Sequence, residues 1–231
     1  MTRVALVALS ALTLLAQVTP KSRAREERRQ RPPLKEEFGY KETSRVNGGA
    51  PVVYAVASNG HQFARVGPDC GEIVDLDKET VTTIDYGKKE YSVITFAELK
   101  KGQPQLKTSV TKTGKQKDIN FFNVYEAIVK VESGGQTLSA DVWLTSGISG
   151  YDNILKFHEL GLPPGQGPLM SELLKEIAKL IAIPMRQEIS ISGSGKPVEI
   201  TIDISAFSGA PNPPSKFAVP AGFKKVTPKR S

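Results

Sequence analysis

The chain has 231 residues, of which 39% are hydrophobic and 24% charged, so it can bury a globular core. Its formal net charge is +7, but residues 1–35 hold eight basic and only two acidic residues, and the last eight residues add four basic groups. The segment between them is slightly acidic, which argues against nucleic-acid binding, because a folded nucleic-acid interface concentrates Lys and Arg on one face. A single cysteine, Cys70, excludes an intrachain disulfide.

An apolar run, Val4–Ala16, follows one basic residue near the N-terminus. The run is short for a transmembrane helix and suits the core of a signal peptide, so we expect residues 1–20 to direct export. An uncleaved membrane anchor or a misplaced start codon are alternatives, because Leu14 is bulky for a cleavage site and basic residues follow at once. Residues 21–35 are charged and contain proline, which predicts a disordered linker before a single domain at 36–227 and a tail at 228–231.

Apolar and polar residues alternate along much of the remaining chain, which predicts strands. Residues 38–46 and 52–66 show the pattern weakly. The stretch Glu72–Phe96 reads as three strands joined by turns near Asp77–Glu79 and Gly87–Lys89. This stretch contains no nucleophile–base pair and no nucleotide-binding loop. It therefore predicts a β-sheet and does not indicate a catalysed reaction.

Two further hairpins follow, and each joins two alternating segments across a glycine-containing turn. The first pairs residues 125–131 with residues 138–144, and the second pairs residues 187–191 with residues 198–204. The count is eight or nine antiparallel strands, each with one apolar face.

Two helices are predicted between these hairpins. The shorter helix spans Asn153–Leu160, with His158 at its surface. The longer helix begins at a Ser171 cap and stops before Pro184. Its apolar stripe at helical spacing comprises Met170, Leu173, Leu174, Ile177, Ala178, Leu180 and Ile181.

So many strands with one apolar face must close on themselves or be covered. We therefore predict a mainly β (α+β) fold, in which a large antiparallel sheet curls into an unclosed β-barrel with one or two helices as a lid. Such an interior can enclose more volume than its side chains fill. Candidate residues for a cavity lining and its lid are Tyr86, Tyr91, Phe96, Tyr125, Trp143, Leu173, Ile177 and Ile181.

The motifs that carry chemistry are incomplete. Gly193–Lys196 lacks the first glycine and the hydroxyl residue of a phosphate-binding loop, and it joins two strands. Asp75, Asp77 and Glu79 have the spacing of a calcium loop but lack its glycine. His61 and His158 are the only histidines, and no strand–turn–helix elbow presents a serine. We therefore expect no catalytic residue, metal ligand or cofactor, and no enzymatic activity.

Three segments resemble the domain of unknown function 4412 family of bacterial proteins. They are the stretch around Glu72–Leu99, the segment Thr113–Glu132 and the ending Lys216–Val226, in which Phe217–Phe223 is the most distinctive part. The resemblance covers residues 36–226 and implies an exported protein similar to the periplasmic lipoprotein-carrier half-barrel. The chain departs from the family pattern in the second segment. Many relatives carry a Cys or small residue after an Ile-Asn-Gly turn, whereas here Phe121 and Phe122 follow Ile119 and Asn120.

These observations favour a periplasmic or secreted binding protein that holds a lipid or other hydrophobic ligand between curved sheet and helical lid. Burying an acyl chain yields about 0.8 kcal/mol per CH₂, so a modest cavity suffices. The alternative is an envelope structural or interaction protein with a packed interior, which would contact an envelope protein partner and remain attached through its N-terminus.

Overall fold

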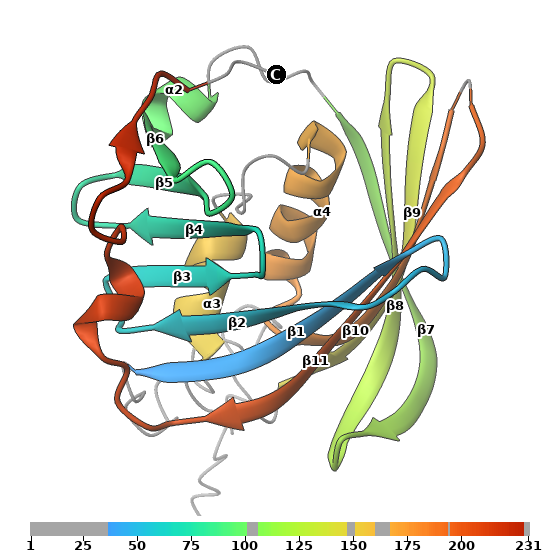
Figure 1. The fold of residues 1–231 in the computed structure, drawn as a ribbon. Helices are drawn as coiled ribbons and strands as arrows, with labels where there is room; N and C mark the ends of the chain where they lie inside the picture. The colour runs from blue at the N-terminus through green and yellow to red at the C-terminus, as the bar shows by residue number, and fades with distance from the viewer. Residues whose placement is uncertain (1–36, 101–105, 147–150, 160–166, 194, 229–231) are drawn as a thin grey trace, which may run out of the picture. The chain divides into compact units, whose positions relative to one another are not determined.

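Twelve strands of the described chain join in one sheet in the computed structural model (Figure 1). The structure describes residues 37–100, 106–146, 151–159, 167–193 and 195–228, all within one compact unit, residues 34–231. The strands are β1 (Phe38–Val46), β2 (Val52–Ser58), β3 (Gln62–Val66), β4 (Cys70–Asp75), β5 (Thr80–Asp85), β6 (Glu90–Thr95), β7 (Lys107–Ile119), β8 (Phe122–Ser133), β9 (Gln136–Thr145), β10 (Ile183–Ser192), β11 (Val198–Ser208) and β12 (Lys224–Lys225). The helices are α2 (Phe96–Lys100), α3 (Tyr151–Glu159), α4 (Gly167–Lys179) and the 3₁₀ helix η1 (Pro214–Phe217).

The strand order is β12-β6-β5-β4-β3-β2-β1-β11-β10-β9-β8-β7, so β12 and β7 are edges and the sheet is not closed. The mainly β, unclosed architecture is therefore confirmed. The predicted count of eight or nine strands is too low. The sheet is antiparallel as predicted except at one edge, where the two-residue β12 runs parallel to β6. Phe96 is also not a strand residue, since it begins α2. The predicted signal segment and linker lie outside the described residues.

One face of the sheet, here called the helix face, packs against α3 and α4. Near α3 the core contains Phe63 and Val74, and the Phe63 ring lies 4.5 Å from the ring of Phe157. Near α4 the core is built from alternating residues of β8, β9 and β10. Leu173 and Ile177 of α4 are both 0% exposed in this core. The predicted amphipathic helix therefore does cover the sheet. The stripe residues between Met170 and Ala178 are buried, whereas Leu180 and Ile181 follow the helix and are half-buried.

The bounds of α4 differ from the expected ones. The helix begins at Gly167, so Ser171 lies inside it and does not cap it. It ends at Lys179, and Ile181 follows with a φ of 55°, the left-handed conformation that commonly terminates a helix. Pro184 does not stop the helix. It lies in β10, next to an irregularity in the pairing with β9. No helix among the described residues is long and apolar enough to cross a membrane.

The opposite face, here called the outer face, is covered over β2–β6 by residues 209–228, the C-terminal strap. Asn212 anchors the start of the strap, because its Nδ2 donates to the carbonyl oxygens of Phe38 at 2.9 Å and Ser58 at 3.1 Å. Phe217 is buried against the sheet in the middle. At the end, β12 pairs with β6, and the Val226 amide donates to the Tyr91 carbonyl at 2.8 Å.

Candidate functional site

A cavity of about 270 Å³ lies between the outer face of β2–β5 and the C-terminal strap. Its lining is mostly aliphatic and comprises Ala55, Val56, Ala57, Ala64, Val66, Glu72, Ile73, Ile84, Tyr86, Ser215, Lys216, Ala218 and Pro220. This space is partly open to solvent, and with few polar groups it suits an apolar small molecule.

Small side chains at the centre of the sheet account for the hollow. Ala57 and Ala64 pair directly across β2 and β3, so two methyl groups meet where larger side chains would fill the space. Both are almost fully buried, at 3% and 1% exposed. The strap bridges this depression because Phe217 packs beside it and holds the backbone above the alanines.

Tyr86 forms part of the cavity wall. Its ring meets that of Phe223 edge-on, with centroids 6.0 Å apart at 78°. The phenol lies over Gly71, where an added Cβ would come within 2.7 Å of the Tyr86 hydroxyl, so a larger residue there would force the Tyr86 ring to shift. Burial raises the pKa of Tyr86 above its ordinary value, so the hydroxyl remains a neutral hydrogen-bond donor at physiological pH.

Lys216 is the one cationic residue of the cavity lining. Its Nζ donates to Asn212 Oδ1 at 3.0 Å, and none of the ion pairs formed by the described residues includes it. An ammonium group has three donors, so two of them are available to a ligand or to water. The cavity is therefore an apolar pocket with a cation on the strap side.

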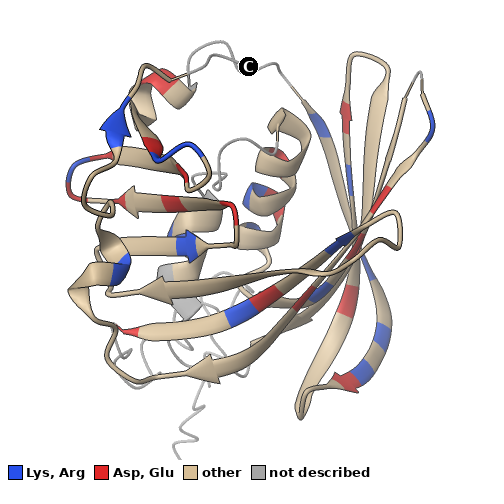
Figure 2. Ribbon diagram, viewed as in Figure 1, with Lys and Arg blue, Asp and Glu red and all other residues tan. Residues whose placement is uncertain are grey.

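A buried charge cluster lies on the helix face, behind the cavity. The Arg65 guanidinium donates to Glu42 through Nη2 at 2.6 Å and stacks on Tyr54 with its Cζ 3.4 Å from the ring centroid. Glu72 pairs directly with Arg65 across β3 and β4. Figure 2 shows acidic and basic residues on β1, β3 and β4. Of the two carboxylates, Glu42 accepts the hydrogen bond from Arg65, whereas Glu72 Oε2 has no hydrogen-bond partner.

The environment of Glu72 keeps its carboxyl group protonated. Burial raises its pKa to about 8, because desolvation outweighs the attraction of Arg65, and Glu42 adds a further repulsion. A protonated Glu72 leaves one positive and one negative charge in the cluster. The arrangement balances charge inside the domain and holds no nucleophile, so it is structural.

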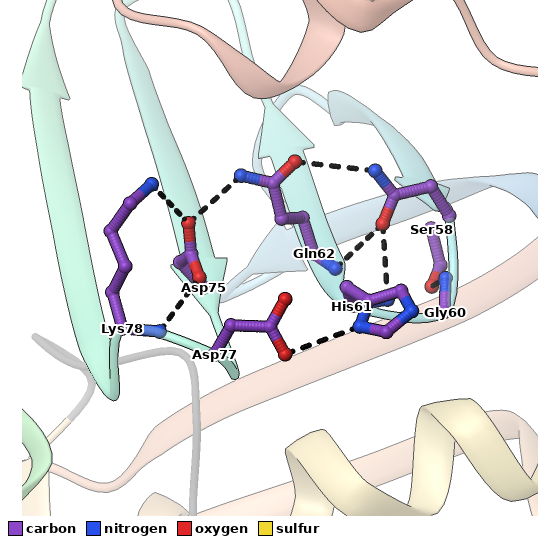
Figure 3. Close-up of polar contacts among 8 residues, drawn as sticks. Ser58, Gly60, His61, Gln62, Asp75, Asp77 and Lys78 are labelled. Carbon is purple, nitrogen blue, oxygen red and sulfur yellow. Dashed lines mark hydrogen bonds and ion pairs between the residues drawn. The ribbon is translucent and has the colours of Figure 1, made fainter.

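A polar network connects the β2–β3 turn to the β4–β5 turn, at one end of the strands that line the cavity (Figure 3). Gln62 Nε2 donates to Asp75 Oδ2 at 3.0 Å, and Lys78 donates to the same carboxylate through its amide and Nζ. Burial alone would raise the pKa of Asp75, but the hydrogen bonds from Lys78 and Gln62 lower it below its ordinary value. His61 Nδ1 lies 3.2 Å from Asp77 in the exposed part of the network. No group of three or more metal-binding side chains converges among the described residues.

The eight predicted site residues do not converge on one cavity. Tyr86 lines the cavity, and Tyr91 lies in the same outer-face cluster under the strap. Phe96 and Ile181 belong to the core at α3, whereas Tyr125, Leu173 and Ile177 belong to the core at α4. Trp143 lies in a separate cluster with Val124 and Met185.

The prediction that His158 lies at the helix surface is wrong. His158 is only 9% exposed, and its Nδ1 has no hydrogen-bond partner. Burial lowers its pKa to about 4, so the imidazole is neutral at physiological pH.

The residues that sequence reasoning missed are the alanines of β2 and β3 and the strap residues above them. The sequence offered two signals. One was the pair of alanines at positions 55 and 57, which lie on the same face of a strand, and the other was the distinctive ending Phe217–Phe223.

No family model matches this sequence, and no curated protein does. Among solved structures, the chain is similar to that of PNGF-II, with 11% identity over 83% of this chain and a TM-score of 0.42. It spans only 31% of the PNGF-II chain. It is also similar to the LolA superfamily protein NE2245 from Nitrosomonas europaea, with 9% identity over 81% of this chain and 92% of that chain, and a TM-score of 0.31. These likenesses are too distant to assign an activity or a ligand, and the resemblance to the domain of unknown function 4412 family stays a prediction.

Removing the Asn212 side chain should loosen the strap. Asn212→Ala leaves the carbonyl groups of Phe38 and Ser58 without their donor, which we expect to cost about 2 kcal/mol of unfolding free energy. Hydrogen exchange should become faster in residues 213–223 and stay unchanged in α4.

Asn59→Ala is the matched control, because Asn59 makes comparable hydrogen bonds to Gln62 in a turn. It should leave exchange in the strap unaltered. Equal exchange in the strap of both variants would show that Asn212 does not anchor it.

Proposed function

We propose that this protein is a non-enzymatic binding protein that holds a small hydrophobic ligand between its sheet and its C-terminal strap. The supporting observation is the aliphatic cavity of about 270 Å³ beneath the strap. Apolar cavities of ~150 Å³ already bind benzene, and ligand pockets begin at about 300 Å³. A short acyl chain or another compact apolar molecule therefore suits the space.

The expected affinity is moderate. A chain of about eight carbons gains roughly 6 kcal/mol on burial, at about 0.8 kcal/mol per methylene, before the cost of association. Without that cost, such a free energy would correspond to a dissociation constant of about 40 μM, so we expect binding in the range of tens of micromolar or weaker. Lys216 favours ligands that carry one acidic group at the strap end, because it supplies free donors and positive charge there.

The proposed position differs from the one expected from sequence. The predicted lid residues Leu173 and Ile177 are completely buried in a packed core, whereas the space lies on the outer face. Export to the periplasm or beyond, predicted from the apolar run Val4–Ala16, is part of the same proposal. A hollow of this size favours a ligand carrier over an interaction protein with a packed interior.

The first test is native mass spectrometry of the chain purified from an exporting host, with mass analysis of any molecule released on denaturation. We expect a bound molecule of low polarity. Titration with the neutral fluorescent probe N-phenyl-1-naphthylamine should then give saturable binding that decanoic acid displaces. A chain without a bound molecule and without saturable probe binding would refute the proposal and favour the packed interaction protein.

A further inference from the structure

The turn between β7 and β8 presents a completely exposed aromatic side chain. Phe121 is 106% exposed, whereas the other large apolar side chains on the described surface reach at most 50%. β7 ends at Ile119 and β8 begins at Phe122, and these two residues pair, so the turn consists of Asn120 and Phe121 alone. A large aromatic at the tip of a two-residue turn contributes nothing to the core.

The backbone at this tip is strained. Asn120 has a φ of 49° and Phe121 a φ of 70°, as a type I′ turn requires at both positions. Asparagine suits the first position, but the second usually holds glycine, and a bulky residue with positive φ is a genuine outlier. Phe121 therefore costs stability twice, through its backbone conformation and through its exposure. A side chain retained at such a cost indicates a role outside the fold.

The tip stands on a rigid base. Ile119 and Phe122 pack on the cluster of Val124, Trp143 and Met185, and the Phe122 ring meets that of Phe207 at 5.8 Å. Asn120 Nδ2 donates to the Ile204 carbonyl at 3.1 Å, which ties the turn to β11. These contacts attach the turn to the sheet, while the Phe121 side chain is fully exposed to solvent.

The strand behind the tip is basic. β7 carries four lysines and one aspartate, and eleven of its thirteen residues are exposed. Figure 2 shows the basic and acidic positions along this strand. Lys117 Nζ lies 3.5 Å from the centroid of the Trp143 ring, close to the tip. Lysines also protect edge strands from aggregation, which accounts for β7 but not for an exposed Phe in a strained turn.

The chemistry of the tip selects its partner. A stable protein interface needs more than one protruding side chain, since specific interfaces bury roughly 800 Å² on each partner. A single aromatic ring beside lysines instead matches the headgroup region of an anionic bilayer, where aromatic side chains insert and lysines meet phosphate groups. We propose that the Asn120–Phe121 turn is a membrane-docking tip that inserts Phe121 into the surface of an anionic bilayer. This proposal does not depend on a ligand in the cavity.

The test uses co-sedimentation of the full chain with vesicles of phosphatidylcholine and phosphatidylglycerol. Phe121→Gly should weaken binding about tenfold, the effect of losing one buried aromatic. The same variant should unfold at a higher temperature than the wild type, because glycine accepts positive φ without strain. Weaker binding by a more stable protein cannot be caused by unfolding.

Val110→Gly is the control variant, because Val110 is a partly exposed apolar residue of β7 away from the tip. This variant should bind vesicles as the wild type does.

A second variant separates the tip from the basic N-terminal segment, which could bind anionic vesicles by itself. In Phe121→Trp combined with Trp143→Phe, the only indole lies at the tip, and its emission should shift to the blue on anionic vesicles. An unshifted emission, unchanged binding by Phe121→Gly, or equal wild-type binding to pure phosphatidylcholine vesicles would each overturn the proposal.

Discussion

Replacing Ala64 with leucine should abolish probe binding without destabilising the protein. The Ala64 methyl group lies on the cavity wall at the centre of β3, and the added carbons would occupy the space that the ligand needs. We expect the affinity for N-phenyl-1-naphthylamine to fall by at least tenfold. The free energy of unfolding should stay constant or rise by about 1 kcal/mol, because filling a cavity commonly stabilises a protein. Probe titration and chemical denaturation measure the two effects.

Ala127→Leu is the matched control. Ala127 is also a fully buried alanine of a central strand, but it faces α4 in the packed core of the helix face. The same three added carbons should therefore cost about 1–3 kcal/mol of stability there. Probe affinity should remain close to that of the wild type.

The pair of variants also locates the ligand. If Ala127→Leu abolished binding and Ala64→Leu did not, the ligand would lie between sheet and helix, as the sequence alone suggested. If both variants bound the probe normally, neither space would be its site, and the proposed carrier function would lose its structural support.

The strands that sequence predicted correctly share one property. In β8 and β11, one face is buried and the other faces solvent, so apolar and polar residues alternate with the period of two that predicts a strand. β7 was missed because it is an edge strand with almost every side chain exposed, so Lys107–Ile119 contains no alternation to detect. Its position is fixed by hydrogen bonds to β8, which local sequence does not reveal.

The site was less predictable than the fold, for a physical reason. Large aromatic residues indicate burial, but a cavity forms where side chains are small, as at Ala57 and Ala64. The strap covers the alanines through contacts between residues 212–226 and strands more than a hundred positions earlier in the chain. The aromatic ends of the motif Phe217–Phe223 were recognisable in the sequence, and the structure now gives them a role, because both side chains pack from the strap onto the outer face of the sheet.

The second large effect concerns the pH dependence of stability, which Glu72 should dominate above neutral pH. Its pKa is about 8 in the folded protein, against an ordinary value of 4.5. Between these values the folded chain retains a proton that the unfolded chain has lost, so this contribution is complete below pH 4.5 and disappears as the pH rises to about 8. Since a tenfold change in proton affinity is worth about 1.4 kcal/mol, the loss is roughly 5 kcal/mol at most.

His158 acts in the opposite direction over a lower range. Its pKa falls from 6.5 to about 4 on folding, so the unfolded chain binds the extra proton between these values and stability rises with pH. From pH 4.5 to 6.5 the two groups oppose each other, and the wild-type stability should form a plateau. Above pH 6.5 His158 no longer contributes, and stability should fall as Glu72 titrates, until about pH 8.

Glu72→Gln should remove this fall, because glutamine fits the same space and does not ionise. Chemical denaturation from pH 4.5 to 9 should show the variant gaining stability up to pH 6.5 and staying level above it, so that it exceeds the wild type by several kcal/mol at pH 9. Glu199→Gln, on the exposed face of β11, is the control and should follow the wild-type curve. Parallel curves for the wild type and Glu72→Gln would show that Glu72 is ionised in the folded state. The buried cluster would then hold two carboxylates against the single guanidinium of Arg65, and the charge balance argued for it would be wrong.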